Sequence, residues 1–242
     1  MTDPRTAVIN QRLSLIRRII AVSSGKGGVG KSMVATTLAL ALAKRGCRVG
    51  LLDLDFTSPS TNLILGAENA KPKEDKGLIP PTVHGLEYMS LVYYTRENPA
   101  PLRGEDTSNV LIELLAVTLW SRLDYLIMDM PPGIGDAVLD LIRIIPRVEF
   151  LVVTTPSQLA FETVKKLVTL LQELNVPIVG VVENMKRTKT RTVQPQTEQM
   201  GLKFLAEIPY DPRLEAAIGN PQRLLGTALG RKVASVAQDL VR

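Results

Sequence analysis

Cysteine is nearly absent from this chain, since Cys47 is the only one among its 242 residues. A single thiol excludes an internal disulfide and cannot by itself build a multi-thiolate metal site. Cys47 lies between Gly46 and an apolar run that begins at Val49. We therefore expect a buried structural thiol rather than a reactive one.

Long apolar runs are also absent, and none approaches the ~18 residues that a membrane span needs. The start of the chain, Met1-Thr2-Asp3-Pro4, lacks the charged-then-apolar layout of a secretion signal. We therefore expect a cytoplasmic location without stable membrane insertion. The net charge of +5 permits an acidic partner without requiring one. With 45% hydrophobic and 22% charged residues, the chain can form one large domain with a substantial core.

Short apolar runs alternate with helical patterns along the chain. Strands are predicted at 19–22, 49–54, 125–130, 150–154, 178–182 and 204–208, and helices at 32–45, 109–119, 137–145, 159–174, 213–218 and 224–241. Runs of Val, Ile and Leu without polar alternation indicate strands covered on both faces. The pattern predicts a single α/β domain (1–242) with a doubly wound, mostly parallel sheet flanked by helices. Residues 1–16 are interpreted as an N-terminal extension and 68–85 as a polar surface insertion.

One run fits the phosphate-binding pattern G-x-x-x-x-G-K-[ST]: Ser24-Gly25-Lys26-Gly27-Gly28-Val29-Gly30-Lys31-Ser32. Its glycines allow successive backbone N–H groups to point into one concavity that binds anions. Lys31 then supplies positive charge to the β- and γ-phosphates, and the Ser32 hydroxyl is placed to ligate Mg²⁺. A strand runs into this loop and a helix runs out of it, so the phosphates would lie at a helix N-terminus.

Lys26 is a second lysine that an ordinary phosphate loop does not need. The run resembles the deviant Walker A motif of the family that includes MinD, ParA, nitrogenase iron protein and the Mrp/ApbC proteins. That resemblance implies that Lys26 reaches across a homodimer interface to the nucleotide of the partner subunit. The alternative interpretation is a solvated loop lysine.

Carboxylates follow two predicted strands. Asp53 and Asp55 end the second strand at i and i+2, which directs both side chains to one face. Asp129 ends the run Leu126-Ile127-Met128, a Walker B pattern. Because open α/β sheets bind ligands at the carboxyl ends of their strands, these acids predict a magnesium site with the Ser32 hydroxyl as a ligand and a water-mediated contact to Asp129 or Asp53.

Further segments narrow the resemblance to the Mrp/ApbC group. Residues 53–60 are similar to its first switch and residues 129–136, which contain Pro-Pro-Gly, to its second. The Glu-Asn-Met element around Asn184 resembles the strand end that brings an Asn to the adenine. Pro209 and Asp211 match the segment on the other side of the base.

The resemblance also assigns roles in catalysis. Asp55 would orient or activate the attacking water, Asp129 would sense the γ-phosphate and Mg²⁺, and Lys26 and Lys31 would stabilise phosphate charge. It implies an ATPase (ATP and water to ADP and phosphate) whose turnover we expect to be slow. GTP is disfavoured because Asn184 is not followed by the Lys-x-Asp that recognises guanine.

The chain departs from the Mrp/ApbC pattern in one respect. The iron–sulfur carriers of that group have a Cys-x-x-Cys shortly after the Glu-Asn-Met element, whereas this chain has no cysteine in that segment. We therefore do not expect an iron–sulfur cluster to bind within this chain alone. A basic loop (185–200) stands in that place and carries Lys186, Arg187, Lys189 and Arg191. It is either a solvated loop or a basic finger that binds nucleic acid.

Three functional classes remain open at this stage. The first is an iron–sulfur assembly factor that lacks its own cluster ligands or acts with a partner that supplies them. The second is a ParA-like ATPase that binds nucleic acid through the basic loop. The third is a regulator, like MinD, whose ATP-bound dimer recruits another protein.

Overall fold

Eight strands form one sheet in the order β10-β9-β8-β1-β7-β2-β6-β5, parallel except for β5, which pairs antiparallel with β6. The computed structural model describes residues 4–56, 58–90, 104–187 and 193–241, with only the backbone for 104–106. The strands of this sheet are β1 (Ile16–Ser24), β2 (Val49–Asp53), β5 (Thr82–Val83), β6 (Leu86–Ser90), β7 (Leu123–Asp129), β8 (Glu149–Thr154), β9 (Ile178–Lys186) and β10 (Phe204–Pro209). This architecture confirms the predicted doubly wound α/β fold.

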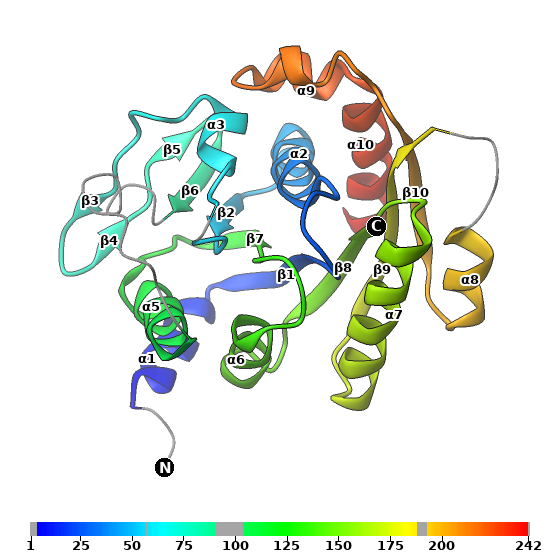
Figure 1. The fold of residues 1–242 in the computed structure, drawn as a ribbon. Coiled ribbons are helices and arrows are strands. Elements are labelled where there is room, and N and C mark those ends of the chain that lie inside the picture. Colours follow the sequence, from blue (N-terminus) through cyan, green and yellow to red (C-terminus); the bar gives the residue numbers. More distant parts are fainter. Residues whose placement is uncertain (1–3, 57, 91–103, 188–192, 242) are drawn as a thin grey trace.

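Helices cover both faces of the sheet (Figure 1). They are α1 (Arg5–Leu13), α2 (Lys31–Lys44), α3 (Thr61–Leu65), α5 (Gly104–Val117), α6 (Asp136–Ile144), α7 (Gln158–Glu173), α8 (Val193–Gln199), α9 (Pro221–Gly226) and α10 (Ala228–Val241), with a 3-10 turn at Glu215–Ala217. In Figure 1, α2, α9 and α10 lie above the sheet and α1, α5, α6 and α7 below it. None of the helices in the described part of the chain has both the length and the apolar character needed to cross a bilayer.

Two hydrophobic clusters, one on each face, follow from the period-2 alternation of the central strands. In β1, Ile19 and Ala21 face the cluster under α5 and α6, whereas Ile20 and Val22 face the cluster under α2 and α10. All four side chains are fully buried. Trp120 is the only tryptophan of the chain and belongs to the cluster under α5 and α6, which we call the lower cluster. Its ring lies so close to Gly50 that a Cβ at that position would overlap it.

Several elements differ from the prediction. Residues 1–16 were expected to form an extension, but α1 buries Ile9 and Leu13 against the core. The predicted helix 224–241 is two helices, because Thr227 adopts an extended backbone and its hydroxyl accepts a hydrogen bond from the Gly230 N–H, which caps α10. The predicted helix 213–218 is only a 3-10 turn. Within 68–85, β3 (Lys73–Glu74) and β4 (Leu78–Ile79) form a separate two-stranded sheet.

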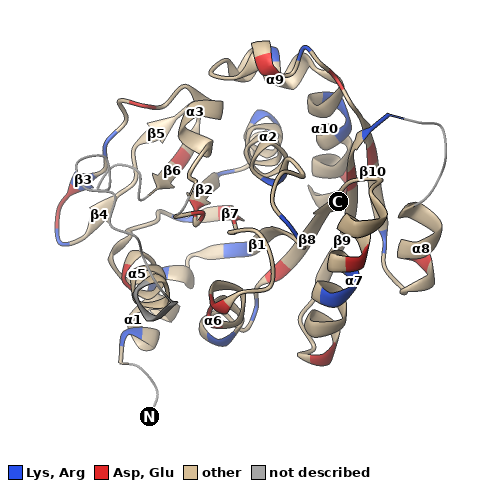
Figure 2. Ribbon diagram, in the orientation of Figure 1, with Lys and Arg blue, Asp and Glu red and all other residues tan. Residues whose placement is uncertain are grey.

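The parallel register brings the strand ends that carry the predicted site to one edge. Asp53 of β2 lies opposite Asp129 of β7, and Val22 of β1 lies opposite the same Asp129. Acidic residues at the ends of β2 and β7 therefore lie beside the loop that joins β1 to α2 (Figure 2).

Candidate nucleotide-binding site

The loop between β1 and α2 has the backbone that its glycines predict. Gly28 and Gly30 adopt φ values of 77° and 80°, in the left-handed region that side chains disfavour. Gly25 lies so close to Thr163 of α7 that a Cβ there would overlap it. The Ser24 hydroxyl closes the turn by donating to the Lys26 carbonyl at 2.9 Å. The loop therefore ends at the N-terminus of α2, where partial positive charge favours phosphate.

Lys31 forms a buried ion pair with Asp129, with 2.5 Å between Nζ and Oδ1. The same ammonium group donates to the Ser32 hydroxyl at 3.3 Å. Burial raises the pKa of Asp129, although the charge and hydrogen bond of Lys31 oppose that rise. The second carboxylate oxygen of Asp129 is buried and has no hydrogen-bond partner within the described residues. No described residue therefore uses the hydrogen-bonding capacity of this oxygen.

Asp53 is held by its neighbours rather than directed at the cavity. Its carboxylate accepts hydrogen bonds from the Asp55 N–H at 3.0 Å and from the Thr61 hydroxyl at 2.6 Å. The Thr61 hydroxyl also contacts the Tyr88 hydroxyl at 2.8 Å. Burial and the nearby charge of Asp129 raise the pKa of Asp53 to about 7. The geometry favours a role for Asp53 in positioning Asp55 and Thr61 over the predicted water-mediated contact to magnesium.

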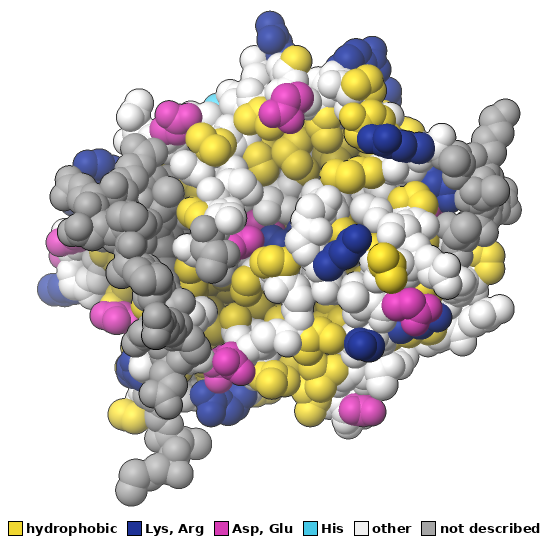
Figure 3. Space-filling view, in the orientation of Figure 1, with side chains coloured by type: hydrophobic (Ala, Val, Ile, Leu, Met, Phe, Trp, Pro, Cys, Tyr) yellow, Lys and Arg dark blue, Asp and Glu magenta, His cyan; other side chains and the backbone are white. Residues whose placement is uncertain are grey.

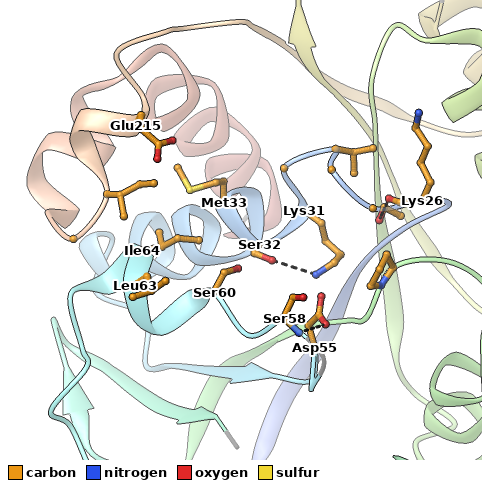
Figure 4. A pocket seen from close by; sticks show the side chains of 18 of the residues that line it. Lys26, Lys31, Ser32, Met33, Asp55, Ser58, Ser60, Leu63, Ile64 and Glu215 are labelled. Carbon is orange, nitrogen blue, oxygen red and sulfur yellow. Dashed lines mark hydrogen bonds between the residues drawn. The ribbon is translucent and has the colours of Figure 1, made fainter. Parts of the chain in front are cut away.

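A cavity of about 690 Å³ lies in front of the loop, and Asp55 contributes to its wall. Asp55 accepts a hydrogen bond from the Ser58 N–H at 3.1 Å. Figure 4 shows the side chains of Lys31, Ser32 and Asp55 converging on one part of this cavity, whereas the Lys26 side chain points away from Lys31. The cavity thus brings together Lys31, Ser32 and Asp55, and Lys26 lines it with its side chain directed away from Lys31.

A second cavity of about 210 Å³ contains the residues predicted to hold a base: Asn184, Pro209 and Asp211 line it. Asn184 donates from Nδ2 to the Val29 carbonyl at 2.9 Å, which ties β9 to the phosphate loop. The carboxylate of Asp211 accepts hydrogen bonds from the Arg213 guanidinium and backbone N–H, and these bonds lower the pKa of Asp211. Met33, Glu215 and Ile218 line both cavities, so the two adjoin.

Some residues of the site were not singled out by the sequence. Ser58 and Ser60 belong to the first-switch segment, so the motif itself signalled them. Thr61 reaches Asp53, Tyr88 of β6 contacts the Thr61 hydroxyl, and Glu215 reaches both cavities from the 3-10 turn. No local pattern in the sequence marks these last three.

The predicted basic loop (185–200) includes the end of β9 and the helix α8, and its first basic residue differs from the prediction. Lys186 is buried and pairs with Glu183 at 2.9 Å, so it is not a solvated contact for nucleic acid. The predicted role of Lys186 in such a contact is therefore wrong. Arg187 is exposed and stacks on the Tyr210 ring, 4.1 Å from its centroid. Lys189 and Arg191 lie outside the described residues.

Comparison with known proteins decides the family. The model of the ParA family described as NUBPL iron-transfer P-loop NTPase matches residues 15–242. The chain belongs to this family. The resemblance to Mrp/ApbC proteins is thereby confirmed, and the fold is that of a P-loop NTPase related to MinD and ParA.

Relatives and solved structures agree with the family. An iron–sulfur cluster carrier protein from Pseudomonas fragi is 46% identical over 177 residues, which is 72% of this chain and 62% of the relative. A carrier protein from Methanocaldococcus jannaschii is 34% identical over 97% of this chain and 88% of its own length. A nucleotide-binding protein from Archaeoglobus fulgidus, in complex with ADP, superposes with a TM-score of 0.78 and 32% identity, covering 92% of this chain and 93% of that protein.

The chain spans only part of several of these relatives. It covers 62% of the Pseudomonas fragi protein and 47% of the iron–sulfur cluster carrier protein from Escherichia coli, to which it is 47% identical over 173 residues.

Proposed function

We propose that this chain is a slow ATPase that forms a homodimer around its nucleotide and acts as a switch in iron–sulfur protein assembly. The observation that carries the proposal is the convergence of Lys31, Ser32 and Asp55 on one cavity, beside a buried Asp129 oxygen that has no partner within the described residues. The family match supports nucleotide binding, and the carrier relatives support the link to iron–sulfur proteins.

ATP would place its phosphates against the N–H groups of the phosphate loop and at the start of α2. The triphosphate would replace Asp129 as the anionic partner of Lys31, because Lys31 pairs with Asp129 and also lines the cavity that the phosphates would enter. The base would enter the second cavity. There Asn184 keeps its Nδ2 on Val29 and offers its carbonyl oxygen to the amino group of adenine.

The residues present fit a magnesium ion. Ser32 supplies a hydroxyl at the cavity wall, and the unpartnered oxygen of Asp129 supplies a carboxylate, which are the oxygen donors that Mg²⁺ prefers. When bound with ATP, the ion supplies charge neutralisation of the phosphates. Asp55 would accept a hydrogen bond from the attacking water and take its proton at the carboxylate, while Lys31 holds the phosphate charge.

The dimer rests on Lys26 and on apolar side chains near the loop. Ile134, Leu139 and Leu159 are exposed, Leu159 to 76%, and they come from the loop and helices that follow β7 and β8. Gly133 donates from its N–H to the Ser24 carbonyl, and Gly25 packs on α7, so these segments adjoin the phosphate loop. Figure 3 shows hydrophobic side chains gathered on this face around α6. A second copy would cover them and receive the outward Lys26.

Measurements of ATP hydrolysis, and of the molecular mass of the protein in solution by sedimentation, test this function. We expect the wild type to bind ATP with Mg²⁺, to sediment as a dimer in a non-hydrolysable ATP analogue and to release phosphate slowly. Lys26→Ala should retain ATP binding and lose turnover, whereas Lys166→Ala, which changes an exposed lysine of α7, should retain both. A wild-type protein that stays monomeric with bound analogue would overturn the dimer.

An iron–sulfur cluster would be cargo that is bound by thiolates outside this chain. Cys47 is the only thiol, and no group of three or more His, Cys, Asp or Glu side chains in the described residues is arranged to hold a metal. We propose that a partner supplies the thiolates. Iron and sulfide measured after anaerobic reconstitution should be near zero for this chain alone. Stoichiometric cluster on the chain alone would contradict this assignment.

A further inference from the structure

A cavity of about 360 Å³ lies at the amino edge of the sheet, opposite the edge that carries the phosphate loop. It forms where β1, β2 and β7 begin, because the parallel register brings the segments before these strands together. Its lining is Ser14, Leu15, Ile16, Arg17, Arg48, Arg122, Leu123 and Asp124. Nothing in the proposed ATPase mechanism uses these residues.

Three arginines and one aspartate give this cavity its charge. Arg48 donates to both oxygens of Asp124, at 3.3 and 3.4 Å, and its backbone N–H donates to the same carboxylate at 2.8 Å. These bonds lower the pKa of Asp124, which therefore stays ionised. The net charge of the lining at neutral pH is +2.

Arg17 and Arg122 differ from Arg48 because neither guanidinium makes a hydrogen bond to another described residue. Both side chains are exposed, and they contribute to the same cavity from β1 and from the turn before β7. Arg17 and Arg122 therefore have unused N–H donors, next to the Arg48 guanidinium that is already bound to Asp124. These N–H groups can donate hydrogen bonds to the oxygen atoms of a ligand.

We propose that this arginine cavity binds a phosphate dianion, as inorganic phosphate or as a small phosphate monoester. Guanidinium groups match phosphate oxygens in bidentate pairs, and such charge-assisted bonds are stronger than neutral ones. A dianion neutralises the +2 lining, whereas a single carboxylate neutralises half of it. The oxygens of phosphate point in tetrahedral directions, so they can accept hydrogen bonds from guanidinium groups that approach from different segments of the chain.

Cys47 provides a local reporter because it directly precedes Arg48 and is the only cysteine. Burial and Asp124 raise the pKa of this thiol, whereas the charge of Arg17 lowers it. An anion held by Arg17 would cancel that effect and raise the thiol pKa further. Alkylation of Cys47 by iodoacetamide at pH 8 should therefore slow by about twofold or more when the cavity is filled.

The test is a calorimetric titration of the full chain, saturated with Mg-ADP, at constant ionic strength. Inorganic phosphate and glycerol 3-phosphate should both bind, and acetate should bind at least tenfold more weakly. Comparison of the two phosphates distinguishes a free ion from a monoester. The variant Arg17→Gln/Arg122→Gln should weaken phosphate binding at least tenfold, since each charged hydrogen bond contributes on the order of a tenfold change in affinity.

Two further variants separate this cavity from the nucleotide site. Arg223→Gln/Lys232→Gln removes two exposed cations on α9 and α10 and should leave phosphate binding and Cys47 protection unchanged. Lys31→Ala should also leave Cys47 protection by phosphate intact. The proposal is overturned if phosphate produces no heat and no Cys47 protection, or if the Arg17/Arg122 variant responds like the wild type.

Discussion

Lys31 and Asp129 hold each other in the interior, with the ammonium and the carboxylate 2.5 Å apart and their side chains 6% and 0% exposed. The lysine that would bind phosphate is therefore already charge-paired before nucleotide arrives. A triphosphate competes with this carboxylate, and removal of either partner leaves an uncompensated charge in a poorly solvated place.

Lys31→Ala should abolish ATP binding and lower the free energy of unfolding of the nucleotide-free protein by ~3 kcal/mol, because Asp129 loses its counter-ion. Equilibrium urea unfolding and ATP calorimetry measure the two effects. The variant Lys31→Ala/Asp129→Asn should recover part of the stability and none of the binding. Wild-type ATP affinity in Lys31→Ala would refute the assignment of the phosphate site.

Asp55→Ala should keep nucleotide binding and stop turnover, because its carboxylate faces the cavity beside Lys31 and is proposed to take the proton of the attacking water. Asp55→Asn should behave similarly while it preserves the acceptor for the Ser58 N–H. Phosphate release and nucleotide affinity, measured on the same preparations, check the result. Glu68→Gln, an exposed acid at the rim of the same cavity, serves as the control and should hydrolyse normally. Normal hydrolysis by Asp55→Ala would remove Asp55 from the mechanism.

The raised pKa of Asp53 predicts that the free energy of unfolding depends on pH. Its pKa is about 7 in the folded chain, and that of an unfolded aspartate is about 4. Between these values the folded protein retains a proton that the unfolded chain has released, so stability falls as pH rises from about 4 to 7, by at most ~1.4 kcal/mol per pH unit. Urea unfolding across this range should give a shallower fall for Asp53→Asn than for the wild type. Identical slopes would show that Asp53 ionises normally.

Gly30→Ala should lower the free energy of unfolding by more than ~1 kcal/mol, because a side chain at φ 80° is strained and its Cβ would overlap Asn184 Nδ2. In an Asn184→Ala background the same substitution should cost less, since the overlapping amide is gone. Gly226→Ala, where nothing lies within 4 Å of the new Cβ, should be neutral or slightly stabilising. Equal costs in both backgrounds would rule out the Gly30–Asn184 contact.

The sequence predicted the parts of the molecule in which local pattern and function coincide. The strands at β1, β2 and β7 have continuous apolar runs that end in the loop or in Asp53 and Asp129, and the structure has them with boundaries shifted by at most three residues. Convergence of Lys31, Ser32 and Asp55 follows because parallel strands share a carboxyl edge.

Features that depend on distant partners were not predictable in the same way. Lys186 looked like one of four solvated cations, but Glu183 and Glu207 of the sheet draw it into the interior. The amphipathic signal of α1 is weak, and only its contact with α5 shows why Ile9 and Leu13 are buried. Cys47 was expected to be buried and is half-exposed, because it lies at the turn before β2 rather than inside the strand.

The position of Trp120 decides what the intrinsic fluorescence of this protein can report. The indole is 4% exposed in the lower cluster, near the start of β7 and away from the phosphate loop at the other end of the strands. Its emission should shift to longer wavelength when the core opens in denaturant and stay constant when ATP is added. A single excitation wavelength thus separates loss of the folded state from occupation of the nucleotide site.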